Sequence, residues 1–255
     1  GALDAFFFFF LIPNFFRRIF GEWALSTAYI PLLIYYINNK NKNEIKNFID
    51  SSITTLSIIL LGISFIGVVT APILIYIIAP GFINSEFGQS ELSGNLLRIT
   101  FPYMLFICLT AVVASILNTY ENFSVPAVTP VILNIILILS VIYVSPYFNE
   151  PVYALAWGLL FGGLVQLTFQ LYPLIRMGLF PKYKFNKKHP GIKKIKELML
   201  PVIFGSSVTQ INLIFDTIIA SFLITGSISW LYMSDRFIEL PLALFGISIA
   251  TVLLP

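Results

Sequence analysis

Charged side chains stand deep within long apolar stretches of this sequence, where they are costly and therefore informative. A charge at the centre of a lipid bilayer costs roughly 2.5–3.5 kcal/mol on insertion scales, so such residues tend to bind ions, pair with one another or hold a ligand. The charges of this kind are Arg17, Arg18, Glu22, Asp216, Asp235, Arg236 and Glu239. Because lipid cannot solvate them, we expect them to face the interior of a helical bundle or a wet cavity.

Two adjacent arginines offer chemistry that suits an anion. In a helix, Arg18 has Glu22 one turn later, and that carboxylate can neutralise it locally. Arg17 has no acidic residue three or four positions away, so its own helix supplies no countercharge. A guanidinium fork matches phosphate oxygens. The spacing therefore favours anion binding at Arg17, with ion pairing between helices as the alternative for both arginines.

The other buried charges allow two interpretations each. Arg236 has Asp235 beside it and Glu239 three residues later, so this group is either a self-contained ion-pair cluster or part of a binding cavity. Asp216 stands alone in the stretch INLIFDTIIASF, and a buried carboxylate must be protonated, paired or bound to a cation. We therefore expect either cation or proton coupling at Asp216, or a role in helix packing.

Motifs of nucleotide-driven or hydrolytic chemistry are absent from the sequence. It has no Walker loop, no paired CxxC, no HExxH and no Ser/His/Asp arrangement, and its single histidine, His189, is expected to be a solvated loop residue. An enzyme is disfavoured, although an intramembrane glycosyl- or acyltransferase that uses paired carboxylates stays as an alternative. Neither a cofactor nor a nucleic-acid partner is indicated.

The composition identifies the elements that must position these charges. Of 255 residues, 58% are hydrophobic and only 11% are charged, which excludes a soluble globular domain. The mean hydropathy is +0.90. No apolar stretch alternates with period two, and each reaches the length of about 20 residues that a membrane helix needs. We therefore predict an all-α, polytopic transmembrane bundle with about seven spans, at residues 5–37, 52–79, 96–119, 126–144, 152–174, 198–224 and 230–255.

The basic residues predict the orientation of the bundle. Most of them lie in two loops, around residues 40–46 and 176–197, which a strictly alternating topology places on the same side. Basic loops stay in the cytoplasm, so residue 1 is predicted to be extracytoplasmic. The 176–197 segment has two compatible interpretations: a topology signal attracted to anionic membrane lipids, and a linker between two helical lobes. Since the sequence begins at Gly1 and ends within an apolar run, we expect a fragment of a longer protein.

Several motifs, in collinear order along the whole chain, resemble one known family. They are LDAFFFFFLIPNFFRRIFGEWALSTAYIP (3–31), APGF (79–82), RITFPY (98–103), ILNTYENFSVPAVTPVILN (116–134), ALAWGLLFGGLVQLTFQ (154–170) and SDRFIELPLALFGISIATVLLP (234–255). Together they resemble the MurJ/MviN proteins, the lipid II flippases of bacterial peptidoglycan synthesis.

This resemblance implies a fold and a function. The fold is that of the MATE-like exporters, with residues 1–175 as an amino-terminal lobe lacking its first span, 176–197 as a cytoplasmic linker and 198–255 as the start of a second lobe. The function is translocation of lipid II, an undecaprenyl-diphosphate-linked disaccharide-pentapeptide, across the bacterial inner membrane by alternating access. Coupling to membrane potential or a cation would take the place of a cofactor. Alternatives of the same fold are another polyprenyl-linked oligosaccharide flippase and a cation-coupled drug exporter.

The resemblance also implies roles for individual residues. Asp4, Arg17 and Arg236 match positions that the family needs for function, and Asp216 matches a position that contributes to a sodium site in some members. Charged positions that line or support the same cavity are matched by Arg18, Glu22 and Glu239. We accordingly expect substrate binding by Arg17, Arg18 and Arg236, support from Asp4, Glu22, Asp235 and Glu239, and a sodium site at Asp216.

Overall fold

The computed structural model describes residues 2–18, 26–82, 89–186 and 189–241, which form helices and connections without a β-strand. The α-helices are α1 (Ala2–Phe16), α2 (Ser26–Asn39), α3 (Lys42–Ile78), α4 (Gln89–Thr100), α5 (Tyr103–Thr119), α6 (Ser124–Leu139), α7 (Val152–Arg176), α8 (Pro190–Ser221) and α9 (Ser227–Pro241). Short helical turns are η2 (Pro80–Phe82), η3 (Ser140–Val144, a π-helix) and η4 (Ser145–Tyr147). The prediction of an all-α fold is confirmed for the described residues.

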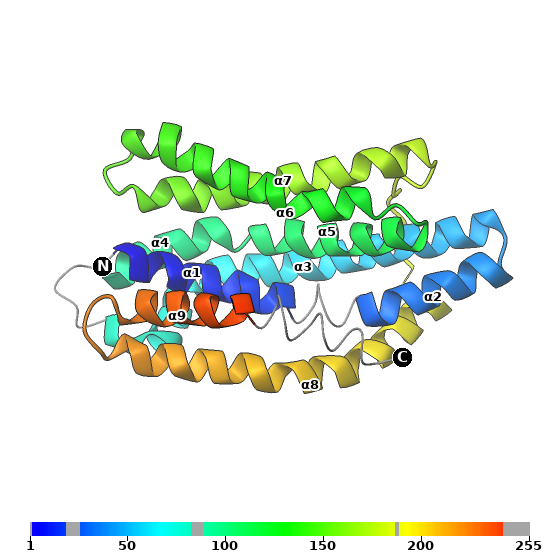
Figure 1. Ribbon diagram of the computed structural model, residues 1–255. Coiled ribbons are helices and arrows are strands. Elements are labelled where there is room, and N and C mark those ends of the chain that lie inside the picture. Colours follow the sequence, from blue (N-terminus) through cyan, green and yellow to red (C-terminus); the bar gives the residue numbers. More distant parts are fainter. Residues whose placement is uncertain (1, 19–25, 83–88, 187–188, 242–255) are drawn as a thin grey trace.

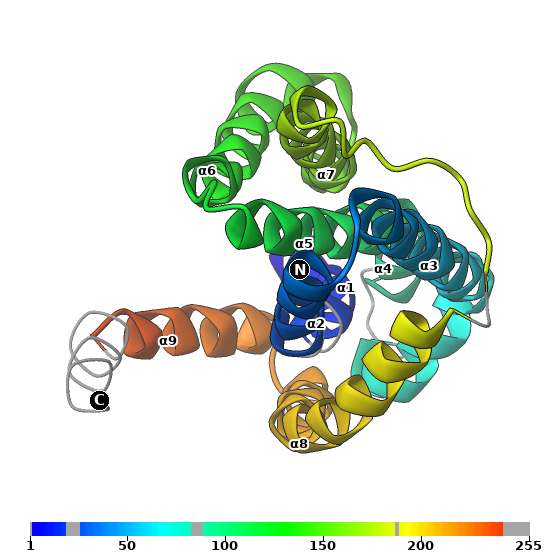
Figure 2. The same cartoon turned by 90° about the vertical axis from the view of Figure 1, so that its right-hand side faces the viewer.

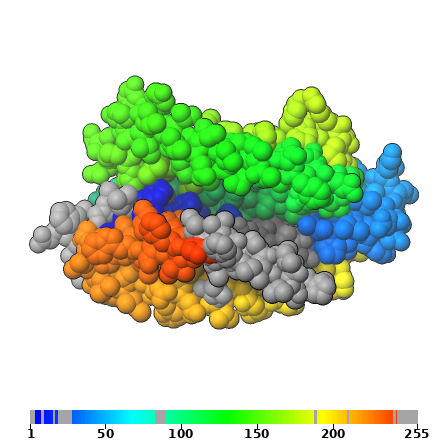
Figure 3. Space-filling view, viewed as in Figure 1, coloured from blue at the N-terminus to red at the C-terminus, as the bar shows by residue number. Residues whose placement is uncertain are grey.

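The helices run side by side along one axis in layers (Figure 1). The α6–α7 pair forms one outer layer, α8 lies on the opposite side, and α5, α3, α1 and α2 fill the space between them (Figures 1 and 2). In the end view, α9 projects to one side of the bundle (Figure 2). On the face shown in Figure 3, only a narrow strip of α1 is visible between the α6–α7 layer and the α8–α9 pair. The start of the chain is therefore an interior element of this bundle.

Within the described residues, five helical segments are long and apolar enough to cross a membrane. They are 42–78, 90–119, 124–147, 152–176 and 190–221. The predicted range 5–37 overlaps both α1 and α2, and residues 19–25 between them lie outside the described residues. The predicted range 230–255 is described as far as the end of α9 at Pro241.

Two helices begin earlier than the hydropathy predicted. Helix α3 starts at Lys42 and α8 at Pro190, where the predicted spans start at residues 52 and 198. At 1.5 Å per residue, α3 is about 55 Å long and α8 about 48 Å, more than the roughly 30 Å of a bilayer core. Their lysine-rich first turns therefore extend beyond the apolar layer as helix, although lysine runs are typical of loops.

A proline divides the predicted span 96–119. Helix α4 ends at Thr100 and α5 begins at Tyr103, because Pro102 has no N–H to continue the helical ladder. At the break, the Phe101 carbonyl still accepts a hydrogen bond from the Met104 amide at 3.1 Å. The chain thus bends at this point without leaving the bundle.

Small residues bring α7 close to α6. A Cβ at Gly162 would lie 2.6 Å from the end of the Leu133 side chain, so a larger residue would require Leu133 to shift. Beside it, buried Gln166 donates to the Thr129 carbonyl at 2.9 Å, and Gln170 donates to the Thr129 hydroxyl at 2.8 Å. The GxxxG motif at residues 158–162 is therefore a close helix contact, as its spacing predicts.

The basic segment 176–197 is fastened to the start of α3. The Lys182 amide donates to Asp50 at 2.9 Å, the Lys184 amide donates to Thr54 at 3.0 Å, and the Lys46 ammonium donates to the Phe180 carbonyl at 2.7 Å. These bonds place the two basic loops at the same end of the bundle, in agreement with the alternating topology.

The end of this segment also caps α8. His189 accepts a hydrogen bond from the Gly191 amide at 3.2 Å and packs near the rings of Tyr36 and Phe48. Burial, aided by the positive charge of Lys184, lowers the pKa of His189 from its ordinary value. His189 therefore lies in the loop, as expected, but its ring is half-buried and caps α8 rather than being fully solvated.

Candidate functional site

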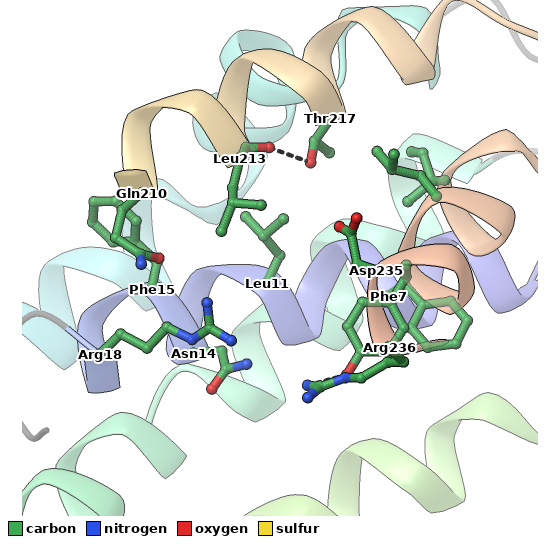
Figure 4. Close-up of a pocket in the computed structure, with 13 residues that line it drawn as sticks. Phe7, Leu11, Asn14, Phe15, Arg18, Gln210, Leu213, Thr217, Asp235 and Arg236 are labelled. Carbon is green, nitrogen blue, oxygen red and sulfur yellow. Dashed lines mark hydrogen bonds between the residues drawn. The ribbon is translucent and has the colours of Figure 1, made fainter. Parts of the chain in front are cut away.

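A cavity of about 90 Å³ lies between α1, α8 and α9 and contains three of the predicted site residues (Figure 4). The charged groups that line it are Arg18 on α1 and Asp235 and Arg236 on α9. Much of the remaining wall is apolar, with Phe7, Leu11 and Leu213 among its residues. The fold thus brings the start of the chain together with residues more than 200 positions later.

The two arginines approach the cavity from different helices. In Figure 4 the side chains of Arg18 and Arg236 extend toward each other, one from α1 and one from α9. Arg236 donates to the Tyr232 hydroxyl at 2.8 Å, and its guanidinium carbon lies 5.0 Å from the centre of that ring. Tyr232 in turn stacks on Phe7 with 4.3 Å between ring centres. Packing between α1 and α9 therefore orients Arg236.

The formal charges of the described lining residues leave the cavity positive, since two arginines face one carboxylate, Asp235. The apolar wall lowers the local dielectric constant, which strengthens the attraction for an anion. This arrangement can hold a phosphate group between two guanidinium groups.

Arg17 lies beside this cavity and does not line it. Its Nε donates to the Oδ1 of Asn14 at 2.7 Å, and Asn14 itself lines the cavity together with Arg18. Residues 14, 17 and 18 share one side of a helical turn, so Arg17 holds the amide that stands next to Arg18. The sequence favoured Arg17 as the anion ligand, whereas in the structure its neighbour Arg18 reaches the cavity.

Asp4 joins the first helix to the last. Its side chain is 2% exposed, and its carboxylate accepts hydrogen bonds from the Gly226 amide at 2.7 Å, from the Ser229 amide at 3.0 Å and from the Ser229 hydroxyl at 2.7 Å. These donors stand at the amino terminus of α9, where the helix dipole favours a negative charge. Asp4 therefore caps α9 and sets the spacing of α1 and α9 along the cavity.

Other predicted site residues lie apart from this cluster. Asp216 is exposed on α8 and does not line the cavity, whereas its neighbour Thr217 does. In the described parts of the chain, no group of three or more His, Cys, Asp or Glu side chains is placed to hold a metal ion. Glu22 lies outside the described residues, and the side chain of Glu239 is not described.

Sequence reasoning did not single out four polar residues that line the cavity. These are Asn14, Gln210, Thr217 and Tyr232. Asn14 and Tyr232 each precede a predicted arginine by four residues, so helical spacing could have identified them. Gln210 and Thr217 are two helical turns apart on the same face of α8. That this face lines the cavity depends on the packing of α8 against α1, which the sequence does not show.

Comparisons with known proteins connect this site to a family. The sequence model described as Lipid II flippase MurJ matches residues 1–255. The chain belongs to the lipid II flippase MurJ family. The resemblance inferred from the motifs is therefore confirmed.

Individual MurJ relatives agree along the whole chain. The chain is 45% identical over 261 residues to a protein of Vibrio cholerae named Probable lipid II flippase MurJ, and that match covers all of this chain and 50% of the relative. It is 38% identical to Lipid II flippase MurJ of Burkholderia cenocepacia over 99% of this chain and 49% of the relative. The chain spans about half the length of the curated relatives it matches.

A solved MurJ structure supports the fold. The structure described as Lipid II flippase MurJ, inward closed conformation, superposes with a TM-score of 0.81 at 33% identity, over 98% of this chain and 51% of that chain. Together with the five long apolar helices, this match identifies the chain as a multi-pass membrane protein with the MurJ helical fold.

Proposed function

We propose that this chain provides the anion-binding part of a lipid II flippase, which moves undecaprenyl-diphosphate-linked disaccharide-pentapeptide between the leaflets of the bacterial inner membrane. The observation that carries the proposal is the convergence of Arg18 and Arg236 on one cavity, in a chain of the MurJ family. A diphosphate is the part of lipid II that two guanidinium groups would recognise. The polyprenyl chain would remain in the surrounding lipid.

Transport by alternating access would have to enlarge this cavity. Its volume of about 90 Å³ is well below the roughly 300–1,000 Å³ of a site that encloses a ligand. Lipid II would therefore bind only after α8 and α9 move away from α1. Asp4 is suited to control this step, because its bonds to the start of α9 must loosen if α9 leaves α1. No bond in the cargo is made or broken, so the proposed protein is a transporter and not an enzyme.

The remaining predicted residues take supporting roles in this proposal. Arg17 would position Asn14 beside the bound anion, and Glu22, Asp235 and Glu239 would balance the charge of the arginines when the site is empty. Asp216 would bind a coupling cation such as sodium together with ligands from outside the described residues. Membrane potential or that cation would drive transport without a cofactor.

The proposed orientation follows from the basic loops. With 176–197 in the cytoplasm, residue 1 is extracytoplasmic, and the Asp4 contact with α9 lies at the extracytoplasmic end. Arg18 follows one helix length later and reaches a greater depth in the membrane. In this state the molecule would thus be closed at its extracytoplasmic end.

Complementation of a flippase-depleted bacterium tests the proposal. The full-length gene would carry Arg18→Ala, Arg236→Ala or Arg17→Ala, with the leaflet location of lipid II as the readout. We expect Arg18→Ala and Arg236→Ala to reduce translocation at least about tenfold, the factor expected for one hydrogen bond to a charged group. Arg98→Ala, at an exposed position of α4, is the matched control that should leave translocation unchanged. Normal translocation by both cavity variants at normal protein levels would exclude the anion-binding mechanism.

The nature of the cargo is tested with the purified full-length protein. Two arginines against one carboxylate favour an anionic cargo, whereas an exporter of organic cations would need an acidic cavity. Proteoliposomes should therefore move a fluorescent lipid II and leave cationic dyes behind. Cleavage or extension of the lipid-linked substrate would instead support a transferase.

A further inference from the structure

A second cavity, of about 290 Å³, lies between α3 and α8 and has no part in the arginine site. Its walls are mainly side chains of α3 and α8, closed on the inner side by α2 and α5. Apolar side chains dominate the lining, including Leu56, Ile59, Leu60, Ile63, Ile195 and Met199. We call this space the α3–α8 groove.

Polar groups gather at one end of the α3–α8 groove. Lys196 on α8 and Thr55 on α3 both line it. The Thr55 hydroxyl is buried and has no hydrogen-bond partner among the described residues. Its neighbour Thr54 accepts the Lys184 amide, so this is the end at which the 176–197 segment crosses from α7 to α8 past α3 (Figure 2). One cation and one unused hydroxyl thus mark the linker end of an apolar space.

A second cavity adjoins the α3–α8 groove on the side away from Lys196 and Thr55. A neighbouring cavity of about 230 Å³ shares Ile63 and follows α3 as far as Ile78, with Ile214 of α8 on its other side. The residues of α3 that line the first cavity, 52–63, extend about 16 Å along the helix axis. The α3–α8 groove is therefore polar at its linker end, and a second apolar cavity adjoins it at Ile63.

The groove is accessible from the lipid side. Ile59 lines it and is 43% exposed, and the adjacent Ile58 and Leu61 are 38% and 54% exposed. In a membrane this outer face of α3 contacts acyl chains. A lipid chain can therefore enter sideways, without passing through water.

We propose that the α3–α8 groove binds one acyl chain of an anionic phospholipid, with the phosphate at Lys196 and a glycerol ester oxygen at the Thr55 hydroxyl. An acyl chain suits the groove because the lining is mainly apolar along α3 and α8 and its outer side faces lipid. An uncharged chain would leave Lys196 without an anion at the groove. The lipid would come from the leaflet on the linker side, where anionic headgroups attract lysines.

Such a lipid would connect the two parts of the chain. Helix α3 precedes the connection at 177–189 and α8 begins directly after it, so the acyl chain would fill the contact between the two helices. Its presence would hold α8 near α3, and its loss would let the two helices separate. The inference rests on the proposed function in one respect, the cytoplasmic location of the 176–197 segment. It does not depend on which cargo is transported.

Photolabelling of the full-length protein in nanodiscs tests this site. The probe is phosphatidylglycerol with a diazirine in one acyl chain, compared with the same probe carrying a phosphatidylcholine headgroup. We expect phosphatidylglycerol to label the peptides that contain 52–63 and 195–203 about fivefold more than phosphatidylcholine, the factor for one lysine near an anionic headgroup. Lys196→Gln should remove this preference, while Lys193→Gln, on an exposed lysine of the same helix, should preserve it.

The outcomes separate this inference from the transport proposal. Equal labelling by both lipids, label confined to the exposed face of α6, or a preference unchanged by Lys196→Gln would each overturn it. Crosslinking of the groove to another part of the protein would also overturn it, because a protein segment would then occupy the space. Lipid II transport, measured on the same samples, tests only the proposed function. Labelling of the groove does not require transport and tests only the lipid site.

Discussion

Asp4 and Asp50 lie at opposite ends of the bundle, and each accepts a backbone hydrogen bond from a segment far away in the sequence. Both residues are buried, with 2% and 4% of their surface exposed. Asp4 accepts hydrogen bonds from the Gly226 and Ser229 amides at the start of α9, whereas Asp50 binds the Lys182 amide together with the ammonium of Lys46. The Asp4 contacts given above join α1 to the start of another helix, whereas those of Asp50 include a lysine one turn earlier on its own helix.

The difference indicates what each end does. The hydrogen bonds of Asp4 to the start of α9 would all break together if α9 moved. This behaviour suits a contact that opens and closes during transport. A contact made with a lysine of its own helix, Lys46, keeps the Asp50 charge paired even when the linker leaves. We therefore expect the Asp4 end to respond more strongly to mutation than the Asp50 end.

The largest effect is expected for Asp4→Ala. This change leaves two amides and a hydroxyl at the start of α9 without an acceptor, at a cost of about 2 kcal/mol or more. The apparent melting temperature of the full-length protein in detergent should fall by several degrees. Ser229→Ala removes only one donor and should cost less than half as much. An unchanged melting temperature for Asp4→Ala would show that the cap does not hold α9.

A smaller and more local effect is expected for Asp50→Ala. The Lys182 amide and the Lys46 ammonium lose their acceptor near the membrane surface, where water can replace it, so the cost should be about 1 kcal/mol. Trypsin should then cleave after Lys182 and Lys184 faster than in the unaltered protein. Asp50→Asn, which keeps an acceptor oxygen, should be intermediate. If Asp4→Ala accelerated the same cleavage equally, the two ends would not be independent.

The smallest effect is expected at His189, which caps α8 next to the Asp50 end. Because burial and Lys184 lower the pKa of His189, the folded protein binds fewer protons there than the unfolded chain. The cap contribution is complete above the unfolded pKa of about 6.5 and is lost as the pH falls below it toward the lowered value. Hydrogen exchange in the first turn of α8 should therefore accelerate between pH 7.5 and 5.5, after correction for intrinsic rates. His189→Asn caps without titrating and should abolish this dependence.

Sequence reasoning predicted the features that depend on local chemistry. Hydropathy and basic loops were enough for the all-α membrane fold and the shared end of the two basic segments. Proline chemistry accounts for the break at Pro102. The start of α8 was predicted too late because Lys193, Lys194 and Lys196 are typical of a loop, although Pro190 after His189 has the pattern of a helix start.

Contacts between distant segments could not be predicted in the same way. Nothing local in the sequence connects Asp4 to Gly226 or Asp50 to Lys182, since these pairs depend on how the helices pack. Helical spacing alone likewise favoured Arg17 over Arg18 as an anion ligand, because Arg17 has no acidic residue three or four positions away and Arg18 has Glu22. It could not show that Arg17 binds Asn14 while Arg18 points toward α8 and α9. The placement of charges in the cavity is therefore a tertiary property.

A double-mutant cycle on Arg18 and Arg236 tests most directly whether both arginines bind one anion. The full-length protein and its Arg18→Ala, Arg236→Ala and double variants would be titrated with a lipid II analogue that carries a short polyprenyl chain. The account predicts that each single variant weakens binding about tenfold or more and that the double variant loses less than the product of the two losses, because the arginines share one diphosphate. Losses that multiply without coupling, or single variants that bind normally, would contradict it.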